Sequence, residues 1–403
     1  MQTPARNGIF VIIAALMLLS AATAPVVAAP REAGEGSSPM AGDFLTGILP
    51  QVESLPSPAW LKEGLRVYYR SSSGKLPKSV SQPISDLSET PLIKPEDLSL
   101  SPFILRTDIT SVSAKKVTSY STVFVDMLMM PWDDYSEISA GGMGSFWIHP
   151  NLLKPKTTDG AGINMTEMAW KILDVEYQAV RLDYYDRAKS GVYYTWIVDK
   201  STGLMLYSAR ISRPKADAEI EFTAAEFYSM RYMSTPWATQ ALPAFAKPGL
   251  KLSYDGNIQT WNQKTGPGLS VPALMLLNLE LVDKRYVQAN LNRVYSEKEV
   301  YDNRVYIGVA QLGGSFWLPV GYLAGLKEGQ VIDKDPITNS ILEVSYIGKG
   351  ADNSNRIAIF EFGRNYKRAW IYRSGDGILV YWMEDKIIDP MTGTSQKSEW
   401  FLR

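Results

Sequence analysis

The sequence predicts a mainly β protein with few short helices, built as two tandem, structurally similar units of curved antiparallel sheet that each resemble a half-barrel. Three observations carry this prediction. Blocks of sequence recur in the same order in the two halves of the chain. Apolar residues alternate with polar ones over short runs. Turn-forming residues separate these runs, and helix signals are few.

The repeat is clearest at Gly144–Trp147, which reads Gly-Ser-Phe-Trp and returns as Gly314–Trp317. The other recurring blocks are Pro58–Tyr69 with Pro243–Tyr254, Ile172–Tyr177 with Ile341–Tyr346, and Trp196–Leu204 with Trp370–Ile378. Blocks that keep one order indicate a duplicated unit. We therefore expect one β-rich unit at residues 55–235 and a second at residues 243–403.

The amino terminus has the plan of a secretory signal peptide at residues 1–29. An apolar run from Ile9 to Leu19 follows Arg6, and small residues continue to Ala29, so cleavage is expected near Ala28 or Ala29. The alternative is an uncleaved anchor over residues 8–29, since a membrane helix needs ~20 apolar residues. No later stretch is long and apolar enough to span. Residues 30–54 predict a flexible leader, and the protein is expected to be exported, periplasmic or extracellular.

The composition excludes several kinds of site. Lys and Arg total 41 against 42 Asp and Glu, a formal net charge of -1, so no long-range field favours nucleic acid. The chain has no cysteine, which excludes thiol catalysis, thiolate metal ligands and a cysteine-linked lipid. We expect no cofactor.

The first unit is expected to consist of strands and hairpins. Residues 71–102 have no sustained period and predict an irregular excursion. From Leu173 apolar and polar residues alternate, and the phase shifts at Val180, which predicts a bulge or tight turn near Ala179. Gly203 is expected in the left-handed conformation that closes a hairpin. The expected strands are Leu65–Tyr69, Val117–Met130, Tyr193–Val198, Leu204–Ala209 and Ile220–Met233, the last of which also has helix-favouring alanines.

The second unit is expected to continue in the order of the first. Its clearest hairpin joins Leu277–Leu281 to Val287–Leu291. Short helices are expected at Val320–Lys327 and at the counterpart Asn151–Lys154. Further strands are expected at Leu342–Ile347, Arg356–Phe362, Lys367–Tyr372 and Ile378–Met383.

The hairpin Trp196–Leu204 resembles one that is common in the periplasmic lipoprotein-carrier proteins. Those proteins fold as an open half-barrel around an apolar cavity. The resemblance therefore implies a half-barrel and a lipid or lipoprotein-like ligand. It covers only this hairpin in each unit, and the second copy departs from it, with Arg373 in place of Asp199.

Four tryptophans at matched positions are the candidate ligand-binding residues: Trp147, Trp196, Trp317 and Trp370. Indole rings stack on sugars and hold acyl chains, so these residues are suited to line a groove. The alternative is that they belong to the cores, where large aromatic side chains are usually buried.

Two other features favour structural roles. His149, the only histidine, lies beside Pro150 without a Gly-x-Ser-x-Gly motif, which indicates a turn residue and not a catalytic base. Asp333–Asn339 alternates oxygen ligands like part of a calcium loop but lacks the glycine and glutamate that complete one. We expect a turn closed by side-chain hydrogen bonds there. No catalytic residue and no metal site are expected.

The sequence favours a non-enzymatic exported envelope protein that binds an apolar or acyl-bearing ligand, or an envelope protein partner, in the concavity of its sheets. One alternative is a hydrolase of envelope polymers that uses carboxylates from Asp174, Glu176, Asp183 and Asp186, which lie close in sequence. The other is a structural scaffold without a small-molecule ligand.

Overall fold

The computed structural model describes residues 55–76, 92, 103–125, 128–139, 142, 146–154, 163–186, 192–212, 220–233, 240–282, 286–295, 298–308 and 316–403. The expected signal peptide and leader lie outside these residues, as do the glycine and serine of each Gly-Ser-Phe-Trp block. No helix within the described ranges is long and apolar enough to cross a membrane.

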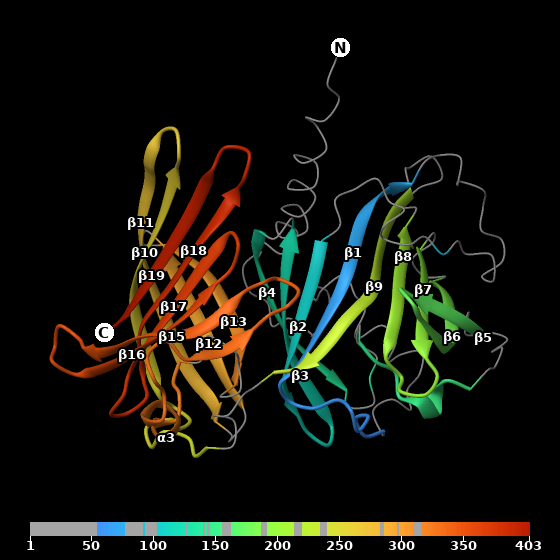
Figure 1. The fold of residues 1–403 in the computed structure, drawn as a ribbon, viewed down its shortest axis with the longest axis horizontal. Helices are drawn as coiled ribbons and strands as arrows, with labels where there is room; N and C mark the ends of the chain where they lie inside the picture. The colour runs from blue at the N-terminus through green and yellow to red at the C-terminus, as the bar shows by residue number, and fades with distance from the viewer. Residues whose placement is uncertain are drawn as a thin grey trace, which may run out of the picture.

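These residues form two antiparallel sheets side by side and almost no helix, so the mainly β fold class is confirmed (Figure 1). The first sheet has nine strands in the order β4-β3-β2-β1-β9-β8-β7-β6-β5. Its strands are β1 (Leu65–Leu76), β2 (Phe103–Val112), β3 (Lys116–Val125), β4 (Leu128–Ser139), β5 (Ile163–Ile172), β6 (Val175–Asp186), β7 (Val192–Asp199), β8 (Met205–Ser212) and β9 (Ile220–Tyr232).

The second sheet has ten strands in the order β13-β12-β11-β10-β19-β18-β17-β16-β15-β14. Its strands are β10 (Lys251–Asn262), β11 (Gly266–Val282), β12 (Tyr286–Tyr295), β13 (Lys298–Gly308), β14 (Val331–Lys334), β15 (Ile341–Lys349), β16 (Asn355–Phe362), β17 (Tyr366–Arg373), β18 (Leu379–Asp389) and β19 (Thr394–Leu402). In the described part of the chain the edge strands of a sheet do not pair with each other, so neither sheet closes into a barrel.

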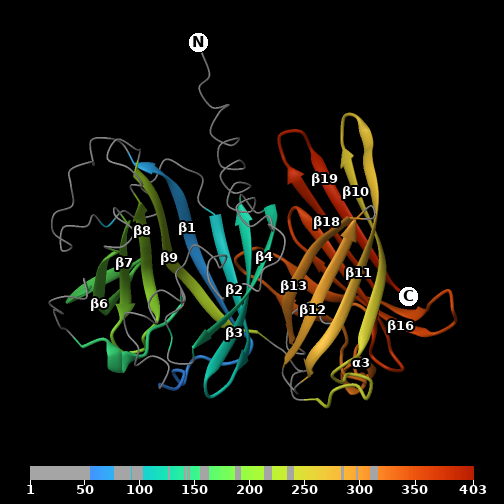
Figure 2. The same ribbon diagram turned by 180° about the vertical axis from the view of Figure 1, so that it is seen from behind.

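The two sheets share one topology, because β1–β9 of the first correspond in order to β10–β13 and β15–β19 of the second, which adds only β14. Individual hydrogen bonds repeat as well. The Tyr69 hydroxyl donates to the Met205 carbonyl at 2.9 Å, and the Tyr254 hydroxyl donates to the Leu379 carbonyl at 3.0 Å. Seen from behind, the strands of the first sheet can be followed from β6 to β4, which lies on the side of the second sheet (Figure 2).

The Phe-Trp bend of each unit packs on the hairpin that follows it. Trp147 forms an isolated bridge with Leu204, and Trp317 forms one with Ile378. The bends also bury their phenylalanines in the cores, with the Phe146 ring centroid 5.7 Å from that of Tyr69. In the second unit the corresponding pair, Tyr254 and Phe316, lies at 5.6 Å. These repeated blocks thus correspond in space.

One of the block matches is wrong. Residues 172–177 span the turn between β5 and β6, where Leu173 has a positive φ of 52°, whereas residues 341–346 run along β15. Strand pairing makes Met165 the equivalent of Val344. Both segments alternate apolar and polar residues, a pattern that many strands share, so their similarity does not reflect a shared position.

The bulge expected near Ala179 is also wrong, because β6 pairs with β5 and β7 without a shift of register. Ala179 and Val180 are both buried, with 1% and 0% of their surface exposed. β6 is covered on both faces at these two residues, so apolar and polar residues do not alternate in this part of the strand. The start of the strand is solvated, since Val175 is 53% exposed.

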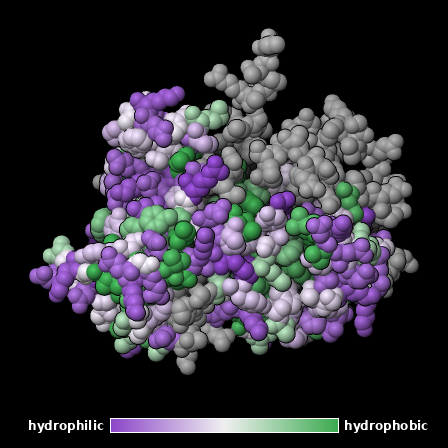
Figure 3. Space-filling model, in the orientation of Figure 1, coloured by the Kyte–Doolittle hydropathy of each residue, from purple (hydrophilic) through white to green (hydrophobic). Residues whose placement is uncertain are grey.

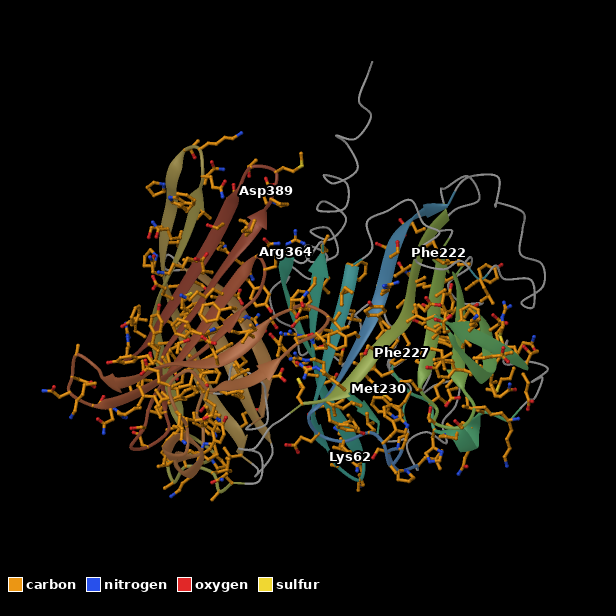
Figure 4. All side chains as sticks on the ribbon, viewed as in Figure 1. Lys62, Phe222, Phe227, Met230, Arg364 and Asp389 are labelled. Carbon is orange, nitrogen blue, oxygen red and sulfur yellow. The ribbon has the colours of Figure 1, made fainter. Side chains whose placement is uncertain are left out.

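Other expectations are corrected in their bounds. The strand expected at Val117–Met130 is split between β3 and β4, whose ends Val125 and Leu128 pair with each other. Pro131 is compatible with β4 because this strand lies at the edge of the sheet. The strand after Leu65 continues through the serines to Leu76. The strand at 220–233 is confirmed as β9, along which Phe222, Phe227 and Met230 follow one another (Figure 4).

The short helices are confirmed as the 3-10 helix η5 (Pro150–Leu152) and the α-helix α3 (Val320–Ala324). Each unit has one large hydrophobic cluster, and this cluster includes the bend and the face of the sheet on which the bend packs. We call this face the inner face of the sheet. On the side of the molecule seen in Figure 3, hydrophobic surface is divided into separate patches by hydrophilic residues.

Candidate functional site: the inner face of the first sheet

All four candidate tryptophans are buried. The exposed fractions are 0% for Trp147, 5% for Trp196, 0% for Trp317 and 2% for Trp370. Trp147 and Trp317 belong to the bends, which favours a core role for them. Trp196 and Trp370 occupy equivalent positions on β7 and β17. Their role in ligand binding stays a prediction.

The second sheet fills its inner face with indole rings. Residues opposite each other on neighbouring strands form a row across a sheet, and the row beyond Trp370 is Trp382, Trp400 and Gly256. The rings of Trp382 and Trp400 are stacked, with centroids 6.3 Å apart and planes at 23°. A Cβ at Gly256 would lie 2.3 Å from a ring atom of Trp400, so the ring requires glycine at this position.

The first sheet has small side chains in the same row. Beyond Trp196 the residues are Ser208 on β8, Ala225 on β9 and Ser71 on β1. Ser71 and Ala225 are buried, with 2% and 1% exposed, and the Ser71 hydroxyl has no hydrogen-bond partner among the described residues. The first sheet therefore lacks the two indole rings that its counterpart places here. This row, with the next one along the strands, is the candidate site.

The next row carries larger, half-buried side chains. It includes Tyr184 on β6, Tyr194 on β7 and Arg210 on β8, opposite one another. The Tyr194 ring stacks on Trp196, with centroids 5.5 Å apart and planes at 1°. The Tyr184 centroid lies 6.3 Å from that of Tyr194. Tyr184, Tyr194 and Trp196 form an aromatic ladder that leads to the row of small residues.

The equivalent row of the second sheet is charged and buried. Glu361, Arg368 and Glu384 replace Tyr184, Tyr194 and Arg210. Arg368 Nε lies 2.8 Å from Glu384 Oε2, and Lys386 pairs with the other oxygen of Glu384. The two inner faces therefore differ in chemistry in two consecutive rows.

The outer face of the first sheet covers this charged row. Arg106 on β2 lies 3.6 Å from Glu361, and the rings of Phe124 on β3 and Tyr366 on β17 have centroids 6.0 Å apart. The edge strand β4 contacts β18 and lies next to the second sheet in Figure 1. One end of the second sheet's inner face is thus occupied by the first sheet.

The contact between the sheets is a buried ionic cluster. Arg66 pairs with Asp108 at 2.5 Å and with Asp335 at 2.9 Å. Asp335 follows β14, so this pair joins the two units directly. The buried cations of the cluster are Arg66, Arg106, Arg368 and Lys386, and its buried carboxylates are Asp108, Asp335, Glu361 and Glu384. The charges of these described residues balance without a further ion.

The charges set the ionisation of these carboxyl groups. Burial by itself raises the pKa of Asp335, but the charges of Arg66 and Arg106 outweigh burial and hold this pKa well below its usual range. Burial likewise opposes ionisation of Glu361, and Arg106 and Arg368 keep its pKa low. Both groups are therefore ionised near neutral pH.

The predicted turns are confirmed. The Asp335 carboxylate accepts hydrogen bonds from the backbone of Ile337 at 2.9 Å and Thr338 at 3.2 Å, which closes the turn considered as a calcium loop. His149 caps η5, and its Nδ1 accepts from the Asn151 backbone at 3.2 Å. Within the described ranges, no three potential metal-binding side chains come together.

The carboxylates considered for hydrolysis do not form a described pair. Asp174 and Glu176 are exposed at the tip of the β5–β6 hairpin. Asp183 is buried and lies seven positions beyond Glu176 along β6, a distance of ~23 Å in an extended strand. It accepts a hydrogen bond from Thr195 and pairs with Arg181 at 2.7 Å. The side chain of Asp186 lies outside the described residues.

The small-residue row was not predicted from the sequence, although part of its signal is present there. Trp196 and Trp370 match in the repeat, and the same offset aligns Ser208 with Trp382, a serine against the bulkiest side chain. The alignment of Ala225 with Trp400 requires the strand register, because the loops before β9 and β19 differ in length.

The comparisons with known proteins do not assign a function. No protein-family model matches the sequence, and no curated protein gives a match. Among solved structures, the chain is similar to a protein of unknown function from the DUF3598 family of Nostoc punctiforme, with 8% identity, 84% of this chain and 95% of that chain covered, and a TM-score of 0.14. At this TM-score the similarity does not indicate a shared fold or function.

Proposed function

We propose that the protein is a non-enzymatic exported binding protein, and that it holds an apolar or acyl-bearing ligand on the inner face of its first sheet. The duplicated units have diverged into two roles in this proposal. The inner face of the second sheet is filled by Trp382 and Trp400 and is covered at one end by the first sheet, so the second sheet serves as support. The first sheet keeps the binding face.

One observation carries the proposal: Ser208, Ala225 and Ser71 stand where the second sheet has Trp382, Trp400 and Gly256. Side chains, water or a ligand must occupy the volume of two indole rings, because protein interiors are close-packed. The aromatic ladder beside these residues offers flat apolar surface for an acyl chain or a ring. The buried Ser71 hydroxyl has no hydrogen-bond partner among the described residues, and a polar group of the ligand would supply one.

The first test is native mass spectrometry of the full-length protein purified from its own host. We expect a bound small amphiphile that dissociates at higher collision energy. Absence of a bound molecule, together with failure to bind hexadecanoate and hexadecan-1-ol in titration, would overturn the proposal. The scaffold alternative, which the charge-balanced contact between the sheets favours, would then stand.

The second test fills the site by copying the second sheet. Ser208→Trp places an indole at the position that is equivalent to Trp382 of the other unit. We expect ligand affinity to fall about tenfold or more, which corresponds to a loss of ~1.4 kcal/mol of binding free energy. Ser270→Trp, at an exposed position on β11, is the matched control and should bind normally. Thermal unfolding verifies that both variants fold. If Ser208→Trp folds and binds as the wild type does, the site lies elsewhere.

A further inference from the structure

Arg210 lies at the edge of the candidate site, and no described residue pairs with its charge. Its side chain is half-buried on β8, opposite Tyr194 on one side and Thr223 on β9 on the other. No carboxylate of the described residues lies within ion-pair distance of it. Glu221, one row further along β9, is exposed and does not pair with it.

The other arginines show how unusual this is. Every other buried or half-buried arginine whose side chain the structure describes has a carboxylate or an aromatic ring as its partner. The pairs are Arg66–Asp108, Arg106–Glu361, Arg181–Asp183, Arg231–Asp333, Arg356–Asp352, Arg368–Glu384 and Arg373–Asp376, and Arg70 lies over the ring of Tyr228.

The counterpart of Arg210 in the second sheet supports the same conclusion. That position is Glu384, which is paired on both sides by Arg368 and Lys386. The second sheet therefore satisfies the charge in this row from within the chain. A partly desolvated guanidinium without an acceptor is unfavourable, and an anion brought by a ligand would supply the missing partner.

We propose that Arg210 binds the anionic head group of the ligand, so that the ligand is an amphiphile with one anionic end. This inference rests on the proposed function, since the apolar body of the ligand would lie on the row of Trp196 and Ala225. Arg210 is two residues from Ser208 along β8, ~7 Å for a strand. The head group and the first carbons of an acyl chain span such a distance. A guanidinium suits carboxylate and phosphate alike, because both accept its paired N–H groups.

The test compares probes that share one alkyl chain. Hexadecanoate, hexadecyl phosphate and hexadecan-1-ol are titrated calorimetrically into the full-length wild type, Arg210→Gln and Arg210→Lys. We expect the wild type to bind at least one anion about tenfold or more tightly than the alcohol. A difference of this size is what a hydrogen bond to a charged group contributes to affinity. Arg210→Gln should remove this preference, so that the anions bind no more tightly than the alcohol, whereas Arg210→Lys should keep part of it. Hexadecanoate and hexadecyl phosphate separate the two kinds of head group.

Arg364→Gln is the matched control, because Arg364 is an exposed arginine in the turn between β16 and β17, far from β8 in Figure 4. It should bind all three probes as the wild type does. If the alcohol binds as well as both anions and Arg210→Gln changes nothing, the role of Arg210 is overturned and the proposed function survives. If the wild type binds none of the probes, the proposed function fails and the role of Arg210 fails with it.

Discussion

Among single residues, two glycines explain why the bend and the hairpin of each unit fit together. Gly203 has a φ of 76°, and a Cβ there would lie 2.0 Å from the Ile148 carbonyl oxygen. Gly377 has a φ of 80°, and its Cβ would lie 2.0 Å from the Leu318 carbonyl oxygen. Each glycine carbonyl accepts the backbone N–H of the same bend residue, at 2.8 and 2.9 Å. Glycine is needed for both conformation and space.

Gly203→Ala should lower the free energy of unfolding by ~2 kcal/mol or more. The left-handed conformation costs an L-residue ~1–2 kcal/mol, and the overlap with the Ile148 carbonyl adds to this. Gly249→Ala is the matched control, since Gly249 has a φ of 83° but no atom within 4 Å of the position that a Cβ would occupy. Urea unfolding of both variants gives the comparison. Equal losses would show that the close approach contributes nothing.

Among the elements, each bend acts as an anchor between the hairpin and the core. Trp147 and Trp317 are fully buried, and each bridges to the residue just before the strand that follows the turn. The Trp317 ring meets Phe245 edge-on, with centroids 6.0 Å apart. A large side chain at such a junction fixes the hairpin on the sheet, because its rotamer is determined by neighbours on both sides.

Trp147→Ala should cost ~3 to 5 kcal/mol of stability, as truncation of large core side chains does. Trp261→Ala, on β10, should change stability little, because Trp261 is 45% exposed. Chemical denaturation followed by circular dichroism measures both. A Trp147→Ala protein with wild-type stability and lost ligand binding would instead return Trp147 to the binding site.

The strands and turns were predicted well where neighbouring residues decide them. The hairpin around Gly203 and the strand pair Leu279 with Ala289 match the expectation. Prediction failed where burial changed along a strand, as at Ala179, and where polar or proline-containing strands lie at an edge, as in β4. In those places tertiary contacts override the local alternation.

For the molecule as a whole, the buried ionic cluster couples the two sheets. Arg66 and Arg106 of the first sheet share Asp335 of the second unit, at 2.9 and 3.6 Å. Arg231 adds a partly buried pair with Asp333 at 2.7 Å. Charges buried in this way are stable only while each keeps its partner. We therefore expect the contact to favour one arrangement of the units over others.

Asp335→Asn should destabilise the protein by ~3 to 5 kcal/mol at neutral pH, because it leaves buried guanidinium groups uncompensated. Asp255→Asn removes an ion pair with Arg403 in which both side chains are exposed, and it should have little effect, as exposed ion pairs contribute little. Differential scanning calorimetry at pH 7 compares the two. Similar melting temperatures for both variants would contradict a coupling role for the cluster.

Low pH should lower the free energy of unfolding of the wild type, because it protonates the buried carboxyl groups of the ionic cluster. The pKa values of Asp335, Glu361 and Glu384 are all lowered in the folded protein. A carboxyl group whose pKa is lower in the folded than in the unfolded protein stabilises the fold at pH values above its unfolded pKa, which is ~4 for these side chains. This stabilisation is lost as the pH falls through the folded pKa. The free energy of unfolding should therefore fall below about pH 4, and less steeply in Asp335→Asn. A pH series of urea unfolding curves measures both slopes.

Local patterns were enough to specify the fold class, the duplication, the turn at Asp335 and the left-handed glycine of the hairpin. These features depend on the properties of residues that are close together in the chain. Only the folded chain shows that the inner face of the second sheet is filled by indole rings and covered at one end. It also shows that Arg210 lies beside the small residues of the first sheet. The pairing of Ser208 with Ala225, and of Arg66 with Asp335, joins residues that are apart in sequence. Such contacts depend on strand register and on the docking of one sheet against the other, which no local pattern encodes.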